Sequence, residues 1–191
     1  MQKITDIDFT ILNFIHEHLS CSFLDFLMPK ITFLGNSGLI WICSSTALLF
    51  FKKSRKTGIE TFAGLSAGVL TGNILLKNLI ARSRPCWIND TIKMLISVPQ
   101  DYSFPSGHTM SSFIAAGIIM HFNKRIGITA YILASMIAFS RLYLYVHFPT
   151  DILAGIILGT AIAYVICRID KKHFTKQVYN QNIDVSPHNM L

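Results

Sequence analysis

Residues 140–151 read SRLYLYVHFPTD, and this stretch lies between two long apolar segments of the chain. It nevertheless carries three ionisable side chains, Arg141, His147 and Asp151. Because such groups are costly near the hydrocarbon core of a bilayer, a cluster of them there indicates a functional site. Pro149 predicts the start of a helix, since proline lacks the N–H that the first turn leaves unpaired anyway. Asp151 then lies about one turn beyond His147, within reach of its imidazole.

One interpretation of this cluster is a phosphate site. A histidine held by a carboxylate, beside an arginine and the positive end of a helix, suits a phosphate group. The alternative is a capped helix that carries a solvated histidine. Residues 140–151 alone do not decide between these two interpretations.

The composition places the chain in a membrane. Of its 191 residues 51% are hydrophobic and 14% are charged, and the mean hydropathy is +0.46. A soluble domain carries about a quarter charged residues. The net charge of +7 does not indicate a nucleic-acid partner, because the basic residues are grouped at the ends of apolar segments. We therefore predict an all-α, polytopic membrane helical bundle that has the lipid bilayer, and no nucleic acid, as its partner.

The pattern along the chain predicts one membrane domain over residues 1–172 and a polar, disordered tail over residues 173–191. Residues 1–20 place isoleucines and leucines at helical spacing against acidic residues such as Asp6 and Asp8, which predicts an amphipathic helix in the membrane interface. Residues 20–35 form a further helical piece, and the sequence leaves open whether it enters the membrane. About five spans are expected, near residues 37–51, 59–80, 106–122, 128–143 and 149–166. Within the second of these, glycines at four-residue steps predict close helix packing: Gly64, Gly68 and Gly72.

Basic residues mark one end of the predicted bundle. Two turns and the tail hold ten of the seventeen lysines and arginines: Lys52, Lys53, Arg55, Lys56, Lys124, Arg125, Arg168, Lys171, Lys172 and Lys176. The positive-inside rule makes that end cytoplasmic. Residues 140–151 and two further polar motifs then fall together at the outer face.

The first of these motifs is KNLIARSRP, residues 77–85, at the end of the second predicted span. Lys77 lies in an apolar helix end, where an ammonium group is expensive unless an anion accompanies it. The alternative is that Lys77 extends to the lipid headgroups. Arg82 and Arg84 follow it.

The second motif is FPSGHTMSS, residues 104–112, which opens the third predicted span. Ser106 and Gly107 offer backbone N–H groups that an anion can approach closely. His108 stands beside them, and the alternative for it is a helix-end histidine bonded to solvent.

Taken together, the three motifs form the pattern Lys-x6-Arg-Pro, Pro-Ser-Gly-His and Ser-Arg-x5-His-x3-Asp, in this order and on one side of the membrane. This pattern resembles the type-2 phosphatidic acid phosphatase superfamily, which also includes vanadium haloperoxidases and bacterial acid phosphatases. The resemblance covers about residues 25–168, and every motif position is matched. It implies a helical fold of the phosphatase and haloperoxidase type.

The resemblance also implies a role for each residue of the motifs. The position of His147 is the nucleophile that becomes phosphohistidine, and that of Asp151 orients its ring. The position of His108 protonates the departing oxygen and then activates water. The remaining motif residues are expected to hold the phosphate oxygens: Lys77, Arg84, Ser106, Gly107 and Arg141.

No metal and no other cofactor are expected. Three cations can stand in for the metal ions of other phosphatases, and the sequence contains no carboxylate cluster typical of a metal site. The four cysteines are scattered without the spacing of metal ligands. Arg82 is a weaker candidate for the site, and we expect it to contact lipid headgroups.

The resemblance therefore implies a metal-independent phosphatase of lipid phosphates or diphosphates at the outer face of the cytoplasmic membrane. Short chains of this type resemble undecaprenyl diphosphate phosphatases, which recycle the carrier lipid of cell-wall synthesis. One alternative is a phosphatidylglycerophosphate or phosphatidate phosphatase. Another, from a different class, is a catalytically silent protein that binds or transports lipid phosphates, although binding alone does not need both histidines and the aspartate. The five spans argue against a haloperoxidase, and the lipid tail and the oligomeric state are left open.

Overall fold

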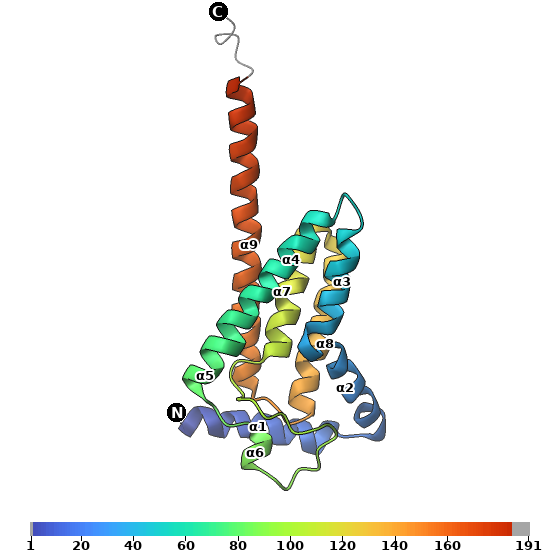
Figure 1. The fold of residues 1–191 in the computed structure, drawn as a ribbon. Helices are drawn as coiled ribbons and strands as arrows, with labels where there is room; N and C mark the ends of the chain where they lie inside the picture. The colour runs from blue at the N-terminus through green and yellow to red at the C-terminus, as the bar shows by residue number, and fades with distance from the viewer. Residues whose placement is uncertain (1, 185–191) are drawn as a thin grey trace, which may run out of the picture.

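The computed structural model describes residues 2–184, and every regular element within that range is helical (Figure 1). The elements are α1 (Gln2–Leu19), α2 (Ser22–Leu34), the short 3-10 helix η1 (Asn36–Gly38), α3 (Leu39–Leu49), α4 (Arg55–Gly68), the π-helix η2 (Val69–Leu76), α5 (Lys77–Ile80), α6 (Pro85–Ile88), α7 (Gly107–Phe122), α8 (Lys124–Tyr143) and α9 (Pro149–Asp184). The predicted all-α architecture is confirmed.

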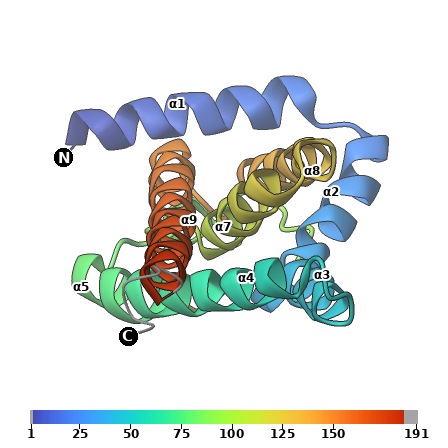
Figure 2. The ribbon, with the colours of Figure 1, turned by 90° about the horizontal axis from the view of Figure 1, so that it is seen from above.

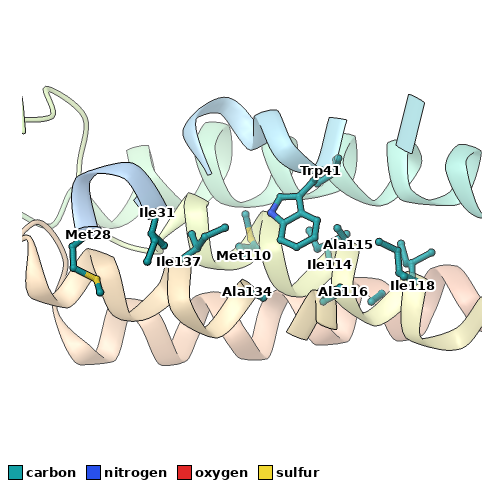
Figure 3. Close-up of a cluster of buried hydrophobic side chains, with 14 of the residues drawn as sticks. Met28, Ile31, Trp41, Met110, Ile114, Ala115, Ala116, Ile118, Ala134 and Ile137 are labelled. Carbon is teal, nitrogen blue, oxygen red and sulfur yellow. The ribbon is translucent and has the colours of Figure 1, made fainter. Parts of the chain in front are cut away.

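The middle of the bundle is formed by α7, which packs against α4, α8 and α9. Most of its buried side chains are apolar, and Figure 3 shows Met110, Ile114 and Ile118 among them. The indole N–H of Trp41, on α3, donates to the hydroxyl of Ser112 at 2.8 Å. Because lipid tails are as apolar as these side chains, close packing and such interhelical hydrogen bonds hold the helices together.

Glycines allow α4 and η2 to lie close to α7. A Cβ atom at Gly64 or Gly68 would come within 3 Å of Ile114, and one at Gly72 would come within 3 Å of Met110. The close helix packing that the sequence predicts for these glycines is therefore confirmed.

Three helical stretches are long and apolar enough to cross a membrane: Arg55–Ile88, Lys124–Tyr143 and Pro149–Ile169. The pair α2 and α3, bent by 47°, makes four if it counts as one span. The chain is thus a multi-pass membrane protein, although the expected five spans are not reached by length and composition. The expected span that is missing from this set is the third, α7, because its 16 residues extend over only about 24 Å.

The two ends of the bundle differ in charge, as the sequence predicts. The turn between α3 and α4 and the junction of α7 and α8 lie at the upper end in Figure 1, where Lys52, Lys53, Lys124 and Arg125 fall. The lower end holds α1, α6, the irregular segment 89–106 and the turn between α8 and α9. All three polar motifs reach this lower end.

At the carboxyl side, α9 continues as a helix to Asp184, whereas we predicted a disordered tail from residue 173. The sequence contains no glycine or proline between residues 171 and 184, so nothing local ends the helix. Residues 185–191, the last part of the predicted tail, lie outside the described residues.

The amino-terminal helix α1 lies across the site end of the bundle, beside α8 and α9 (Figures 1 and 2). Its exposed side carries an apolar stripe that includes Ile7, which is 61% exposed, beside polar residues such as Asp6 and Thr10. An amphipathic helix over these residues is what the sequence predicts. However, Asp8, which we placed on its polar side, points into the bundle and is 1% exposed.

Candidate active site

The turn between α8 and α9 carries a buried histidine–aspartate pair. Nδ1 of His147 lies 3.5 Å from Oδ2 of Asp151, four residues further on, because α9 begins at Pro149 as predicted. The same oxygen accepts hydrogen bonds from the N–H of Phe148, at 2.9 Å, and from the hydroxyl of Ser103. Asp151 therefore faces Nδ1 as a fixed acceptor.

The other ring nitrogen of His147 points toward the cations of the site. Its Nε2 lies 3.1 Å from Nη1 of Arg84, which also donates to the carbonyl of Val146 at 2.7 Å. With the proton on Nδ1, opposite the carboxylate, Nε2 keeps its lone pair. Burial, followed by the charges of Arg84, Arg141 and Lys77, holds the pKa of His147 well below its ordinary value of 6.5. The imidazole is thus a neutral base and a potential nucleophile.

Three cations from three elements are buried around this ring. Lys77 begins α5 directly after the π-helix η2, Arg84 is the residue before α6, and Arg141 lies in the last turn of α8. π-helical segments often occur at functional sites, and here the eight-residue π-helix ends directly before Lys77. The polar N–H groups of Arg141 include an Nε that is buried and has no hydrogen-bond partner in the described chain. An unsatisfied guanidinium group of this kind favours an anion beside it.

One carboxylate, Asp101, lies among these cations and was missed by the sequence analysis. It forms ion pairs with Lys77 and, at 2.7 Å, with Nη2 of Arg84, while its side chain remains 55% exposed. Burial raises the pKa of this carboxyl, but the Lys77 hydrogen bond and the two positive charges outweigh it and lower the pKa to about 2. The sequence signal was an acidic residue just before the FPSGH motif.

The start of α7 carries the FPSGHTMSS motif. Gly107 approaches Asn73 so closely that a Cβ atom would lie 2.8 Å from its Oδ1. Nε2 of His108 lies 2.9 Å from Oδ1 of Asn36, a residue of η1. Ser106 is the N-cap of α7, where its hydroxyl accepts a hydrogen bond from the Thr109 hydroxyl at 3.0 Å.

These groups surround a cavity of about 1170 Å³ with two chemically different regions. Its polar part is lined by Asp101 and by six of the predicted site residues: Lys77, Arg84, Gly107, His108, Arg141 and His147. Its apolar part extends between α2 and α3 on one side and α4 and η2 on the other, and is lined by Phe33, Ile42, Phe62, Leu65, Val69 and Leu70. The cavity therefore fits a molecule with an anionic head and an apolar chain.

Two of the predicted site residues do not line this cavity. Asp151 stands behind His147, as its predicted orienting role requires, and Ser106 is turned toward Thr109 and α7. Arg82, for which we expected contacts with headgroups, instead donates to Oδ1 of Asp151 at 2.7 Å and to Asp8 at 2.6 Å. That expectation was wrong, because Arg82 finds two buried carboxylates within its reach.

Within the part of the chain that the structure describes, no three histidine, cysteine, aspartate or glutamate side chains form a group that could hold a metal ion. The arrangement can act on an anion with the groups of the chain itself. It brings His147, His108 and three cations together around one pocket.

Comparison with known proteins agrees with this chemistry. The family model of the PAP2 superfamily matches residues 59–175. The chain is 31% identical over 140 residues to the undecaprenyl-diphosphatase of Sulfolobus acidocaldarius, in a match that covers 73% of this chain and 68% of that protein. It is 29% identical over 171 residues to phosphatidylglycerophosphatase B of Bacillus subtilis, which covers 81% of this chain and 72% of the relative.

The fold has a counterpart among solved structures. The crystal structure of a transmembrane PAP2 type phosphatidylglycerolphosphate phosphatase from Bacillus subtilis superposes with a TM-score of 0.75. The superposition covers 90% of this chain and 88% of the other, at 25% sequence identity. The residues that the family model matches, 59–175, include all three motifs of the site. The chain therefore belongs to the PAP2 superfamily.

Proposed function

We propose that this phosphatase hydrolyses a lipid phosphate or diphosphate through a phosphohistidine on His147, and that its substrate is undecaprenyl diphosphate. One observation carries the proposal: three buried cations face a single carboxylate at the polar end of a cavity whose other wall is apolar. An excess of two positive charges is costly in such surroundings unless an anion joins it. A phosphorylated lipid supplies both the anion and the apolar chain.

In the first step, Nε2 of His147 forms a bond to the terminal phosphorus and the bond to the leaving oxygen breaks. His108 donates a proton to that oxygen, and the lipid leaves with one phosphate fewer. The positive charge that develops on the His147 ring is stabilised by Asp151, which faces Nδ1. The enzyme is left with a phosphoryl group on nitrogen.

In the second step, water attacks the phosphohistidine while His108 accepts a proton from it. The bond between phosphorus and nitrogen breaks, and inorganic phosphate leaves with neutral His147 restored. During both steps, the non-bridging oxygens carry charge that Lys77, Arg84 and Arg141 stabilise, together with the Gly107 N–H at the start of α7. Ser106 contributes as the cap that fixes this helix start. The mechanism uses no metal ion.

The choice of undecaprenyl diphosphate is supported by two arguments. The basic end of the bundle predicts a cytoplasmic side opposite the site, so the site faces the outside of the plasma membrane, where carrier lipid is released. A relative that is 31% identical carries the name undecaprenyl-diphosphatase. The second candidate is phosphatidylglycerophosphate, because the match to phosphatidylglycerophosphatase B covers more of the chain.

A silent binding protein with the same pocket is the alternative from another class. Holding an anion needs the cations, but it needs neither a histidine with its Nε2 toward the anion nor a carboxylate behind that ring. Both are present: Nε2 of His147 lies 3.1 Å from Nη1 of Arg84, and Nδ1 of the same ring lies 3.5 Å from Oδ2 of Asp151.

The proposal is tested with purified protein and a panel of undecaprenyl diphosphate, phosphatidylglycerophosphate and phosphatidate. We expect release of phosphate with EDTA present, the highest kcat/KM for undecaprenyl diphosphate, and loss of turnover in His147→Asn. Wild-type protein quenched in alkaline detergent should carry phosphate on nitrogen, because His147 is the nucleophile. Near-normal turnover of His147→Asn would refute the mechanism, and a preference for another lipid would refute the substrate.

A further inference from the structure

An ionic chain connects α1 to the back of the histidine–aspartate pair. Oδ2 of Asp8 accepts from Nη2 of Arg82 at 2.6 Å, and Nη1 of Arg82 donates to Oδ1 of Asp151 at 2.7 Å. Thr150 bridges Asp8 and Arg82, because its hydroxyl donates to Asp8 and accepts from Arg82, while its N–H donates to Asp8 at 3.1 Å. The chain therefore runs from Asp8 through Arg82 and Asp151 to His147.

Each oxygen of Asp151 has a separate task in this arrangement. Oδ2 faces His147, Ser103 and the N–H of Phe148, whereas Oδ1 is held by Arg82. Among the described residues, Arg82 is the only lysine or arginine with a side-chain nitrogen within 4 Å of an Asp151 oxygen. Its guanidinium group lies over the ring of Phe148, 4.0 Å from the centroid, which fixes it in place. Arg82 also accepts the Ser103 N–H at its carbonyl, at 2.8 Å.

Independent contacts hold α1 against the turn that carries the nucleophile. The ring of Phe9 meets Phe148 edge to face at 5.1 Å, and the Tyr145 hydroxyl donates to Asn13 at 2.7 Å. Leu12 is fully buried against the same two aromatic rings. Tyr145 has a φ of +57°, a conformation that residues other than glycine keep only when their surroundings impose it. α1 is part of those surroundings.

We propose that Arg82 and Asp8 are positioning residues for the chemical step: Arg82 holds Asp151 in place behind His147, and Asp8 of α1 holds Arg82. This role rests on the proposed function and adds residues to it that the family match, over residues 59–175, covers only in part. Asp8 lies outside that range, on the amino-terminal helix α1. Neither residue lines the cavity, so neither is expected to bind the phosphate.

This position behind the ring predicts a specific kinetic signature. Arg82→Gln leaves two buried carboxylates without their shared cation, so the orientation and charge of Asp151 are disturbed while the phosphate cradle is kept. We expect kcat to fall about 10- to 100-fold, the usual effect of removing a group that orients a reacting residue. KM and inhibition by vanadate are expected to stay near wild type. Arg82→Lys keeps the positive charge and should restore part of the lost kcat.

The role of Asp8 is tested through Arg82. Asp8→Asn should lower kcat less than Arg82→Gln, because Asp151 keeps its cation. Adding Asp8→Asn to Arg82→Gln should cause no further loss, because Asp8 acts through Arg82. Asn13→Ala is the matched control: it removes a contact of the same helix with the same turn but touches no charge, and kcat should stay within about twofold.

A spectroscopic measurement completes the experiment without depending on the lipid. The nitrogen-15 signals of the His147 ring, assigned by their absence in His147→Asn, should shift in Arg82→Gln and not in Asn13→Ala. Unchanged kcat and unchanged ring signals in Arg82→Gln would overturn the positioning role, as would an equal rise in KM and fall in kcat. Failure of the proposed function is distinguishable, because wild-type protein would then turn over none of the lipid phosphates.

Discussion

Asp101 places a carboxylate between two of the cations that the proposed reaction uses for phosphate. Its oxygens contact Lys77 and Arg84, and its pKa of about 2 keeps it ionised. A phosphate that binds these cations must therefore displace Asp101 or share them with it. Half of the side chain is exposed, so it can move aside.

We expect Asp101→Asn to bind anions more tightly. Removing the competing charge should lower the inhibition constant of vanadate by about tenfold, which corresponds to about 1.4 kcal/mol. Gln100→Ala, at the exposed neighbouring position, serves as the control. Vanadate inhibition that is unchanged or weaker in Asp101→Asn would show that the carboxylate does not occupy the phosphate position.

The protonation of His147 gives a second prediction at this scale. Burial and the cations Arg84, Arg141 and Lys77 lower its pKa, against the opposing charges of Asp101 and, behind Nδ1, Asp151. A lowered pKa means that the folded protein binds fewer protons than the unfolded chain below pH 6.5. Acid should therefore cost stability there while the ring itself stays neutral.

The nitrogen-15 spectrum of the His147 ring reports its protonation directly. As the pH falls from 7 to about 5, the His147 signals should keep the pattern of a neutral imidazole. A His147 midpoint near that of an ordinary histidine would contradict the effect of burial and of the three cations.

Among the helices, α7 and α8 cross so closely that a glycine is required. A Cβ atom at Gly127 would lie 2.3 Å from Cα and 2.8 Å from N of Met120, which are backbone atoms that no change of rotamer can move. Alanine is otherwise the better helix former by about 1 kcal/mol. At Gly127 the clash with backbone outweighs this helix preference, so alanine is expected to lower the stability of the protein.

Gly127→Ala should therefore destabilise the bundle, by about 1–3 kcal/mol as for an overpacked core. The measurement is thermal unfolding in detergent micelles, with Thr129→Ala at an exposed position of the same helix as the control. A variant as stable as wild type would mean that the two helices can separate at little cost.

The distance in sequence between partners explains how much of the fold and site could be predicted. His147 and Asp151 are only four residues apart, on either side of the helix start at Pro149, so their contact could be predicted from local sequence. The glycines of α4 and η2 likewise carry their own periodicity. By contrast, 74 residues separate Asp8 from Arg82, and 72 separate Asn36 from His108. Such partners depend on how the helices pack, which no local pattern records.

At the scale of the whole molecule, the charges at the two ends of the bundle predict which side of the membrane the site faces. The turn at Lys53 and the loop at Lys93 lie at opposite ends, and both side chains are exposed. The basic residues at the first of these ends predict that it is cytoplasmic. The orientation decides whether the enzyme meets lipid in the inner or the outer leaflet.

This orientation can be measured with single cysteines on a background without Cys21, Cys43, Cys86 and Cys167. An impermeant thiol reagent should label Lys93→Cys in intact cells and Lys53→Cys only after the membrane is opened. Lysis with detergent, followed by labelling of both, checks that each thiol is reactive. The reverse pattern would remove the support for a substrate in the outer leaflet.

The two-part cavity also has a practical consequence for the choice of solubilising agent. Three cations at one end and an apolar wall at the other do not distinguish a lipid phosphate from any other amphiphile with an anionic head. Alkyl sulfates and fatty acids meet that description, whereas maltosides with the same chain do not. Extraction in an alkyl sulfate would thus fill the pocket with the extractant, so kinetics measured in maltoside micelles report the enzyme's own preference.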